Sequence, residues 1–539
     1  METLASTKTQ SWLYWFLRGA LILGFLILFS RLLELSIIKG EYFRSLSEEN
    51  RIRRIPISAP RGKILARAGQ ELVGNKEVQK TIVFNSESGY EKVDYQEGDS
   101  RQEAITEWAR DYRLGAALGH VSGYLGQVSE EEVGKVNPEC PEKGPRKLGG
   151  WVGRSGLEQQ YECLLSGIDG EELVEVDTTG EKVRTLGKKD PVAGQDLKTS
   201  IDISLQERVA ASMANKKGAA VAVGGGGEVL ALYSYPSFDP NLFVSKGSDS
   251  QIQALLQDPD EPFFNRAIGG LFHPGSVFKP IVAVAAVEEG KVDANYIYND
   301  PGVITIGRFS YSNWFFNQYG STEGNIDLER AIARSTDTFF YKVGEIVGVE
   351  KIAEWAAKFG LDKPSGIDIP GEVAGLVPSP EWKLKVKGER WFLGNTYHMA
   401  IGQGDIALTP IALNSATLAI ATAGKLCEPK IGQEPTCSKI ELNENSVKMV
   451  KKGMESACSP GGTGYTFFDF EPRVGCKTGT AETSLEGEPH AWFTVFAPVD
   501  FPEITLTVLV EKGGEGSKVA GPIAKEIFDF WFHGKIPSQ

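Results

Sequence analysis

The 539-residue sequence predicts an α+β protein with one N-terminal transmembrane helix, an irregular mixed segment and a C-terminal domain in which helices cover an antiparallel sheet. Three observations lead to this prediction. An apolar stretch near the N-terminus is long enough to cross a bilayer, the sequence changes character at Asp196, and strand-like runs lie on both sides of a long helical block. A chain of this length has room for about three domains, so at least one large core can be buried.

The apolar stretch Trp12–Ser30 carries one charge, Arg18, near its aromatic end. A helix of that length spans roughly 28 Å, close to the hydrocarbon thickness of a bilayer, and the stem of Arg18 can carry its charge to the interface. The residues that follow contain no small-x-small site of the kind that ends a signal peptide. We therefore expect an uncleaved anchor over residues 12–33 behind a cytoplasmic tail, residues 1–11, with a buried core helix as the alternative.

The composition excludes several classes of function. The formal charge is 57 − 71 = −14, so the chain lacks the basic surface that nucleic-acid binding requires. Five histidines without a close His/Cys/Asp cluster argue against metal chemistry, and we expect neither a metal nor a cofactor. Six cysteines are too few for a disulfide scaffold in so long a chain, although Cys427 and Cys437 flank a short loop and could pair outside the cytoplasm. Cys476 is expected to be a buried core residue rather than a nucleophile.

Residues 40–196 are mixed, charged and locally irregular. Strand-like runs at Thr81–Phe84 and Glu172–Val176 alternate with turns marked by Gly and Pro, and a helix is expected near Ser129–Val136. Such a segment is typical of a spacer or an interaction module.

From Asp196 onward the pattern is that of a domain with strands at both ends. The runs Ala219–Val223 and Glu228–Tyr235 are joined by Gly224–Gly227, which we interpret as a hairpin turn because a phosphate-binding loop would need a Lys-Ser/Thr pair and a following helix. Two more strand-like runs and a closing helix lie near the C-terminus, at His490–Pro498, Ile504–Glu511 and Gly521–Phe532. With a helical block at about 268–425 between them, these strands predict one α+β domain.

The first candidate catalytic element is Ser276-Val277-Phe278-Lys279, which follows a Pro-Gly turn and opens an apolar helical run. Positions i and i+3 share a helix face, so Ser276 and Lys279 can meet there. A serine hydroxyl becomes a nucleophile when a neighbouring base takes its proton, and a lysine can be that base if burial or a nearby cation lowers its pKa. The pattern is weak by itself, because Ser36-Ile37-Ile38-Lys39 has the same spacing beside the predicted anchor.

Two further elements follow in the chain, Ser335-Thr336-Asp337 and Lys477-Thr478-Gly479-Thr480. Ser and Asp in the first could simply cap a helix, and the second could be an ordinary exposed strand end. As a strand edge ending in glycine, the second could also present a cation, a hydroxyl and a backbone N–H to a carboxylate and an oxyanion. Each element is common by chance, whereas the ordered set is not.

The ordered set is similar to the S-x-x-K, S-D-N and K-T-G signature of penicillin-binding proteins and class A β-lactamases. The chain as a whole resembles a class B penicillin-binding protein, a peptidoglycan D,D-transpeptidase, and within that family the elongation-type penicillin-binding protein 2 group. The resemblance covers nearly all of the chain after the anchor and includes Ala59–Ile64, Gly153–Glu158, Tyr235–Asn241 and His490–Phe493. Asp337 stands where the family more usually has Asn, and both it and Gly402-Gln403-Gly404 are similar to the elongation group.

The resemblance implies a role for each motif residue. Ser276 would be the acylated nucleophile, and Lys279 would take its proton. Ser335 would relay a proton to the leaving amine with help from Lys477. The backbone N–H groups of Ser276 and Thr480 would form the oxyanion hole. The residues that would bind substrate are Asp337, Thr478, Gly479 and Thr480, with the two threonines on its terminal carboxylate.

The resemblance also implies substrates, partners and location. The donor would be a peptidoglycan stem peptide ending in two D-alanines, and penicillin and other β-lactams would acylate Ser276 in the same way. Residues 40–196 would form a pedestal or dimerisation domain and residues 197–535 a β-lactamase-like serine transpeptidase domain. Too little chain precedes Asp196 for a glycosyltransferase domain, so the implied partner is a separate SEDS-type glycosyltransferase. The protein would be a single-pass protein of the bacterial inner membrane with its catalytic domain on the periplasmic side.

The sequence also bears on a possible zinc site and on two alternative functions. Some relatives hold zinc just before the second motif, but Tyr311–Asp327 contains neither His nor Cys, so we expect no zinc here. A D,D-carboxypeptidase or a β-lactam-hydrolysing enzyme on the same fold would need a positioned water, and no Glu can be assigned the deacylating role it has in class A β-lactamases. A non-catalytic scaffold of the wall-synthesis complex would have no need of an intact set of motif residues.

Overall fold

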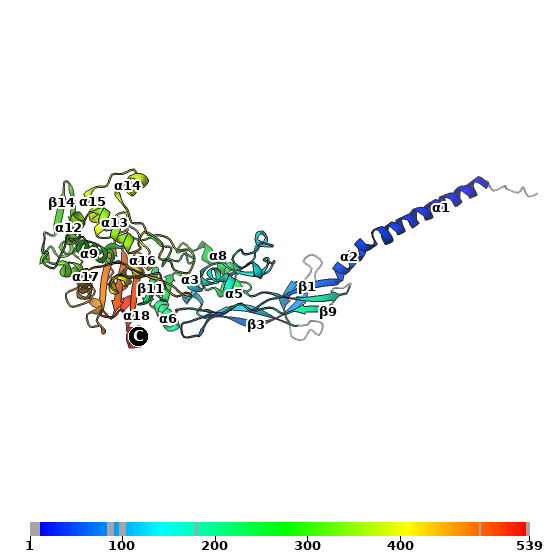
Figure 1. Ribbon diagram of the computed structural model, residues 1–539, viewed down its shortest axis with the longest axis horizontal. Coiled ribbons are helices and arrows are strands. Elements are labelled where there is room, and N and C mark those ends of the chain that lie inside the picture. The colour runs from blue at the N-terminus through cyan, green and yellow to red at the C-terminus, as the bar shows by residue number, and fades with distance from the viewer. Residues whose placement is uncertain (1–10, 84–90, 96–103, 178–181, 484–486, 535–539) are drawn as a thin grey trace, which may run out of the picture. The chain divides into compact units, whose positions relative to one another are not determined.

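The computed structural model describes residues 11–83, 91–95, 104–177, 182–483 and 487–534 (Figure 1). The chain forms two compact units. One comprises residues 1–60, 77–108 and 168–192, and the other residues 61–76, 109–167 and 193–539. The N-terminal helices belong to the first unit, and all three candidate motifs belong to the second.

The first unit begins with α1 (Ser11–Leu33), which continues through a π-helical turn (Glu34–Ile38) into α2 (Gly40–Arg51). The span Trp12–Ile38 has a mean hydropathy of 2.2, and none of it is buried. A helix this long and apolar, with no protein packed on it, is suited to a lipid environment. The membrane anchor predicted at residues 12–33 fits this helix, and the alternative of a buried core helix does not.

The strands of the first unit are β1 (Ile52–Ile57), β4 (Glu91–Asp94), β8 (Gly170–Val176), β9 (Lys182–Lys189), the last part of β3 (Glu71–Val83) and the first part of β5 (Ile105–Tyr112). β8 pairs antiparallel with both β1 and β9, and β3 pairs with β4. The strands predicted at Glu172–Val176 and Thr81–Phe84 are confirmed, except for Phe84, which lies outside the described residues.

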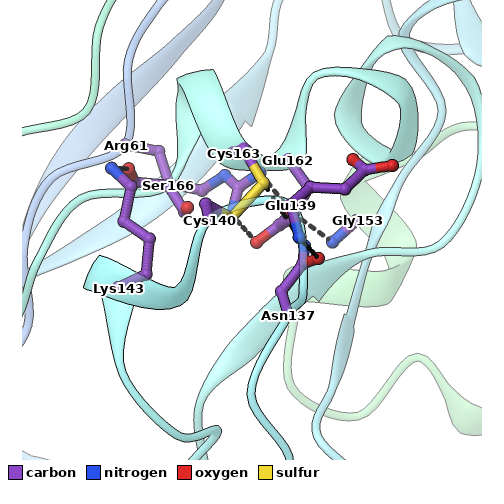
Figure 2. Close-up of a disulfide and its surroundings, with 9 residues drawn as sticks. All are labelled: Arg61, Asn137, Glu139, Cys140, Lys143, Gly153, Glu162, Cys163 and Ser166. Atoms are coloured by element: carbon purple, nitrogen blue, oxygen red, sulfur yellow. Dashed lines mark hydrogen bonds and ion pairs between the residues drawn. A yellow bond between two sulfur atoms is a disulfide. The ribbon is translucent and has the colours of Figure 1, made fainter.

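The second unit begins with β2 (Ile64–Leu65), the end of β5, α3 (Gly119–Ser122), β6 (Leu125–Gln127), β7 (Trp151–Gly153), α4 (Gly156–Gln160), α5 (Glu162–Leu165) and β10 (Leu197–Lys198). β6 and β7 pair antiparallel, and the residues between them form an arm. The disulfide Cys140–Cys163 ties this arm to α5 (Figure 2). Beside it, Lys143 Nζ donates to the Ser166 carbonyl at 2.7 Å.

The prediction of a helix near Ser129–Val136 is wrong, because only a 3-10 turn, Glu130–Glu132, forms there. The Glu132 carboxylate accepts from the Ser129 backbone N–H at 3.0 Å, which closes a single turn. Gly134 then adopts a φ of 80°, which turns the chain out of the helical region. An ion pair of 2.6 Å between Glu132 and Arg154 holds the turn to the returning strand of the arm.

All six cysteines are paired, as Cys140–Cys163, Cys427–Cys437 and Cys458–Cys476. The pairing proposed for Cys427 and Cys437 is confirmed. Cys476 is fully buried, as expected, but it is also bonded to Cys458. The two other pairs did not follow from the sequence.

The second unit is built on an antiparallel sheet. In the described part of the chain its strand order is β12 (Val229–Tyr235), β11 (Gly218–Gly224), β21 (Ile504–Val510), β20 (His490–Ala497) and β19 (Gly475–Ala481). β11 and β12 pair directly, and the Gly227 backbone N–H donates to the Gly224 carbonyl at 2.9 Å. The predicted hairpin turn is therefore confirmed, and so are the strands on either side of it.

Helices cover both faces of this sheet. Successive residues of a strand point to opposite faces, and Trp492 and Phe493 accordingly belong to different hydrophobic cores. On the face of Phe493 lie α6 (Ile203–Ser212) and α18 (Ala520–His533). On the other face lies the buried helix α16 (Pro410–Ala421), whose Asn414 Nδ2 donates to the Val221 carbonyl of β11 at 2.9 Å. This is the α+β, helix-covered sheet that the sequence predicts (Figure 1).

The other helices of the unit are α7 (Asn241–Val244), α8 (Asp249–Gln257), α9 (Lys279–Glu288), α10 (Trp314–Tyr319), α11 (Leu328–Arg334), α12 (Asp337–Val347), α13 (Val349–Lys358), α14 (Pro380–Lys387), α15 (Leu393–Ala400) and α17 (Glu444–Ala457). Its short strands pair as β13 (Tyr298–Asp300) with β16 (Gly324–Ile326), β14 (Val303–Ile306) with β15 (Phe309–Ser312), and β17 (Lys425–Cys427) with β18 (Cys437–Lys439). The block predicted to be helical at about 268–425 thus consists of helices with short hairpins between them.

Candidate active site

Ser276 lies in a 3-10 turn, Gly275–Phe278, that leads directly into α9. Gly275 has a φ of 56°, and its backbone N–H donates to the Gly402 carbonyl at 2.8 Å. A Cβ atom on Gly275 would lie 3.1 Å from the Thr480 carbonyl oxygen, and one on Gly402 would lie 2.1 Å from the Gly275 carbonyl oxygen. The turn that carries Ser276 is therefore held closely between Gly402 and β19, which brings the first and third motifs together.

Lys279 is fully buried one helical turn after Ser276. Its Nζ atom donates to the Ser335 carbonyl at 2.8 Å, to Ser335 Oγ at 3.2 Å and to Asp337 Oδ1 at 2.6 Å. Among the described contacts, the Lys279 ammonium thus binds the second motif rather than Ser276 Oγ. The first and second motifs meet at this lysine.

Ser335 joins the two lysines of the site. It follows α11 in the left-handed conformation, with φ 57° and ψ 37°, which few non-glycine residues adopt. Strain of this kind persists where the surrounding structure enforces it, as in active sites. Ser335 Oγ accepts from Lys477 Nζ at 2.9 Å as well as from Lys279.

The third motif lies on β19, whose Lys477 is fully buried and whose Thr480 is exposed. Lys477 Nζ also donates to the Thr478 carbonyl at 2.9 Å. The Thr480 hydroxyl accepts from the Gly516 backbone N–H at 3.3 Å. A Cβ atom on Gly479 would lie 3.0 Å from both Val277 and Trp492, so a larger residue would displace the strand from its neighbours.

Burial lowers the pKa of both lysines. It lowers the pKa of Lys279 below its ordinary value, and the facing Asp337 carboxylate opposes this shift. Burial, and then the charge of Lys279, lower the pKa of Lys477 well below its ordinary value. Both lysines are thus nearer to the neutral form that can accept a proton from a hydroxyl.

Three residues that the sequence did not point to also support the site. The Trp314 backbone N–H donates to Asp337 Oδ2 at 3.0 Å, and the Asp337 N–H donates to Asn313 Oδ1 at 3.3 Å. Thr478 Oγ1 donates to Thr463 Oγ1 at 2.9 Å. These partners belong to no motif and are separated in sequence by 23, 24 and 15 residues, so no local spacing could reveal them.

Within the described ranges, the structure contains no group of three or more His, Cys, Asp or Glu side chains arranged to hold a metal ion. The Asp300 carboxylate, which lies just before Tyr311–Asp327, is instead used in hydrogen bonds. It accepts from Thr338 Oγ1 at 2.6 Å and from Asn313 Nδ2 at 3.2 Å.

A serine at a helix start, two buried lysines and an edge strand on a helix-covered sheet are groups that a serine acyltransferase requires. Residues 218–529 match the penicillin binding protein transpeptidase domain, and residues 102–199 match the penicillin-binding protein dimerisation domain. The first match alone covers more than half of the chain, which therefore belongs to the penicillin-binding protein transpeptidase family.

Relatives of this family align along most of the chain. The peptidoglycan D,D-transpeptidase MrdA of Acinetobacter baumannii is 31% identical, over 95% of this chain and 86% of its own length. Penicillin-binding protein 2 in its complex with MreC from Helicobacter pylori is 27% identical with a TM-score of 0.77, over 90% of this chain and 99% of that one. A chain of a peptidoglycan synthase complex that coordinates polymerization and crosslinking is 27% identical with a TM-score of 0.76, over 99% and 100% of the two chains.

Proposed function

We propose that this chain is a peptidoglycan D,D-transpeptidase of wall elongation that works through an acyl-enzyme on Ser276. The observation that carries the proposal is the convergence of Lys279 Nζ and Lys477 Nζ on Ser335 Oγ, beside the turn that holds Ser276. MrdA relatives with the same activity in their name support it.

In the proposed acylation step, neutral Lys279 takes the Ser276 Oγ proton, and the oxygen attacks the carbonyl carbon of the penultimate D-alanine. The oxyanion that forms would face the backbone N–H groups of Ser276 and Thr480, since the Gly275 turn adjoins β19. Collapse of this intermediate breaks the C–N bond to the terminal D-alanine. Ser335 Oγ gives a proton to that amine, and Lys279 replaces it with the proton taken from Ser276, while Lys477 Nζ stays hydrogen-bonded to the same oxygen.

In the second step, the side-chain amine of a neighbouring stem attacks the acyl carbon, and the ester C–O bond to Ser276 breaks. Lys279 takes a proton from the attacking amine and returns it to Ser276 Oγ. Thr478, Gly479 and Thr480 would bind the donor's carboxylate along β19, since an edge strand leaves alternate N–H groups available to a ligand. Asp337 would hold Lys279 and the start of α12. A β-lactam would acylate Ser276 by opening its own ring, and its amine would stay attached.

The test uses the full chain in detergent with a donor peptide that ends in D-Ala-D-Ala, with and without an acceptor amine. We expect D-alanine release to rise with the acceptor and a cross-linked product to form. Benzylpenicillin is expected to give one stable adduct by intact mass. Release without acceptor, or continuous production of penicilloate, would identify a carboxypeptidase or a hydrolase instead, and no reaction at all would identify a scaffold.

Asp337→Asn is expected to shift the acidic limb of the pH–rate profile for penicillin acylation to lower pH. The Asp337 carboxylate favours the protonated forms of Lys279 and Lys477, so its loss lowers the pKa of both and keeps the base neutral at lower pH. The second-order acylation rate measured across pH gives the shift, with the exposed carboxylate variant Asp362→Asn as control. If the acidic limb of the Asp337→Asn profile does not move, the assignment of Lys279 as the base that deprotonates Ser276 is contradicted.

The finer points of location and assembly belong to the same proposal. Three disulfides are expected of a protein exposed to an oxidising compartment, which supports a single-pass protein of the inner membrane with residues 40–196 and 197–535 on the periplasmic side. These ranges, as pedestal and transpeptidase domains, are supported by the two family matches. The similar chain in a peptidoglycan synthase complex that coordinates polymerization and crosslinking supports a separate glycosyltransferase, of SEDS type, as partner.

A further inference from the structure

β19 carries Lys477, Thr478 and Thr480 at the edge of the sheet, where β20 is its partner among the described strands. An edge strand is held by one ladder of hydrogen bonds rather than two. Its position in the site therefore depends strongly on what else is attached to it.

One such attachment is covalent. Cys476, the residue before Lys477, is bonded to Cys458, the residue that follows α17, and the two are 0% and 4% exposed. Gly464 lies directly against the disulfide, since a Cβ atom there would be 2.6 Å from Cys476 Sγ and 2.9 Å from Cys458 Sγ. The disulfide thus closes a tightly packed loop, residues 458–476, next to the motif strand.

The closed loop reaches both sides of the site. Thr463 Oγ1 accepts from Thr478 Oγ1 at 2.9 Å, and the Thr463 backbone N–H donates to the Ala333 carbonyl of α11 at 3.1 Å. The Gly464 N–H donates to the Ala457 carbonyl at 2.8 Å. Thr463 therefore links the motif strand to the end of the helix that precedes Ser335.

The helix at the other end of the disulfide contacts the same element. Ser456 Oγ donates to Glu329 of α11 at 2.7 Å. A Cβ atom on Gly453 of α17 would lie 2.7 Å from Ile332 of α11, so these two helices are in close contact. α11 ends at Ser335. A single covalent bond consequently joins the strand of Lys477 to the helix pair that supports Ser335.

We propose that the Cys458–Cys476 disulfide is a positioning element for acylation, which keeps Lys477 Nζ within hydrogen-bond distance of Ser335 Oγ. Neither sulfur touches the reacting atoms, so the disulfide acts through β19 and the 458–476 loop. The inference rests on the proposed function, because the step that it controls is the acylation of Ser276. A displacement of about 1 Å in such a site costs roughly 10²-fold in rate.

The test compares two double variants of the full chain in detergent, Cys458→Ala/Cys476→Ala and Cys427→Ala/Cys437→Ala. The second is a matched control, because it removes a disulfide of the same unit that closes the β17–β18 hairpin. The readout is penicillin acylation, separated into the binding constant and the first-order acylation rate, with folding checked by circular dichroism. We expect the first variant to lose about tenfold or more in acylation rate with little change in binding, and the control to stay within about twofold.

Equal acylation rates for the two folded variants would overturn the inference, even if both melt at lower temperature, because a purely structural role predicts that result. Should the Cys458→Ala/Cys476→Ala chain not fold, Thr463→Val removes the contact to Thr478 with the disulfide intact, and Thr463→Ser restores it. We expect Thr463→Val to lower the acylation rate and Thr463→Ser to retain the wild-type rate. A Thr463→Val variant that is acylated as fast as wild type would overturn the inference. A wild-type chain that penicillin does not acylate would instead refute the proposed function.

Discussion

Ser276→Ala is expected to abolish the covalent adduct with benzylpenicillin while the protein stays folded. Ser276 is only half-buried in its turn, whereas the adjacent Val277 and Phe278 fill the core, so loss of one hydroxyl removes little packing. Removal of the nucleophile from a serine acyltransferase lowers its rate by a factor on the order of 10⁶. Intact mass after incubation with benzylpenicillin measures the result directly.

Ser36→Ala provides the matched control, because Ser36 and Lys39 have the same spacing as Ser276 and Lys279. Lys39 forms an ion pair of 2.8 Å with Glu34 and is half-exposed, so it has neither the burial of Lys279 nor that residue's contacts with the second motif. We expect Ser36→Ala to retain a full adduct. An adduct that persists in Ser276→Ala, mapped by peptide digestion to another hydroxyl, would contradict the assignment.

The comparison of these two serines shows how much of the site could be predicted. The S-x-x-K spacing is local, so both pairs were visible in the sequence, and only the order of three motifs separated them. The contact of Lys279 with Ser335 spans 56 residues and that of Lys477 with Ser335 spans 142. Such contacts depend on the packing of α9, α11 and β19, which no local pattern contains.

The fold likewise has parts that local sequence signals predict and parts that only tertiary packing determines. The sequence predicts the strands β11, β12, β20 and β21 because short apolar runs and a glycine turn are local signals. Cys427 and Cys437 are 10 residues apart around a turn, so their pairing was predictable, whereas the other pairs are 18 and 23 apart and are brought together by tertiary structure. At Ser129–Val136 the polar pattern favoured a helix, but the left-handed Gly134 and the Glu132–Arg154 ion pair override it.

Glu158→Ala is expected to destabilise the second unit by about 3–5 kcal/mol, because it leaves the buried Arg110 without its counter-charge and leaves Arg61 paired with Glu162 alone. Glu158 is 0% exposed. Its carboxylate accepts from Arg110 Nε at 2.6 Å and from Arg61 Nη2 at 2.9 Å. Arg110 Nη1 continues to the Gly62 carbonyl at 2.8 Å, so the cluster ties three separate segments of the chain together.

Glu162→Ala is the control, since Glu162 also pairs with Arg61, at 2.8 Å, but its side chain is 16% exposed and water can replace it. We expect a loss of about 1 kcal/mol there. Urea unfolding of the full chain in detergent, followed by tryptophan fluorescence, compares the two variants. Equal losses would show that the fully buried Glu158 contributes no more than the partly exposed Glu162.

The pH dependence of the Glu158→Ala effect provides a second check. Burial alone would raise the pKa of Glu158, but Arg110 and Arg61 outweigh it, and the net pKa lies below the ordinary value. A carboxyl with a lowered folded-state pKa stabilises the fold above its unfolded pKa, and this contribution is lost as the pH falls through the folded value. Wild type and Glu158→Ala should therefore differ most in free energy of unfolding at neutral pH. The part of this difference that comes from the Glu158 charge should become smaller in acid. A difference that is constant with pH would mean that the loss comes from the cavity left by the side chain and not from the charge.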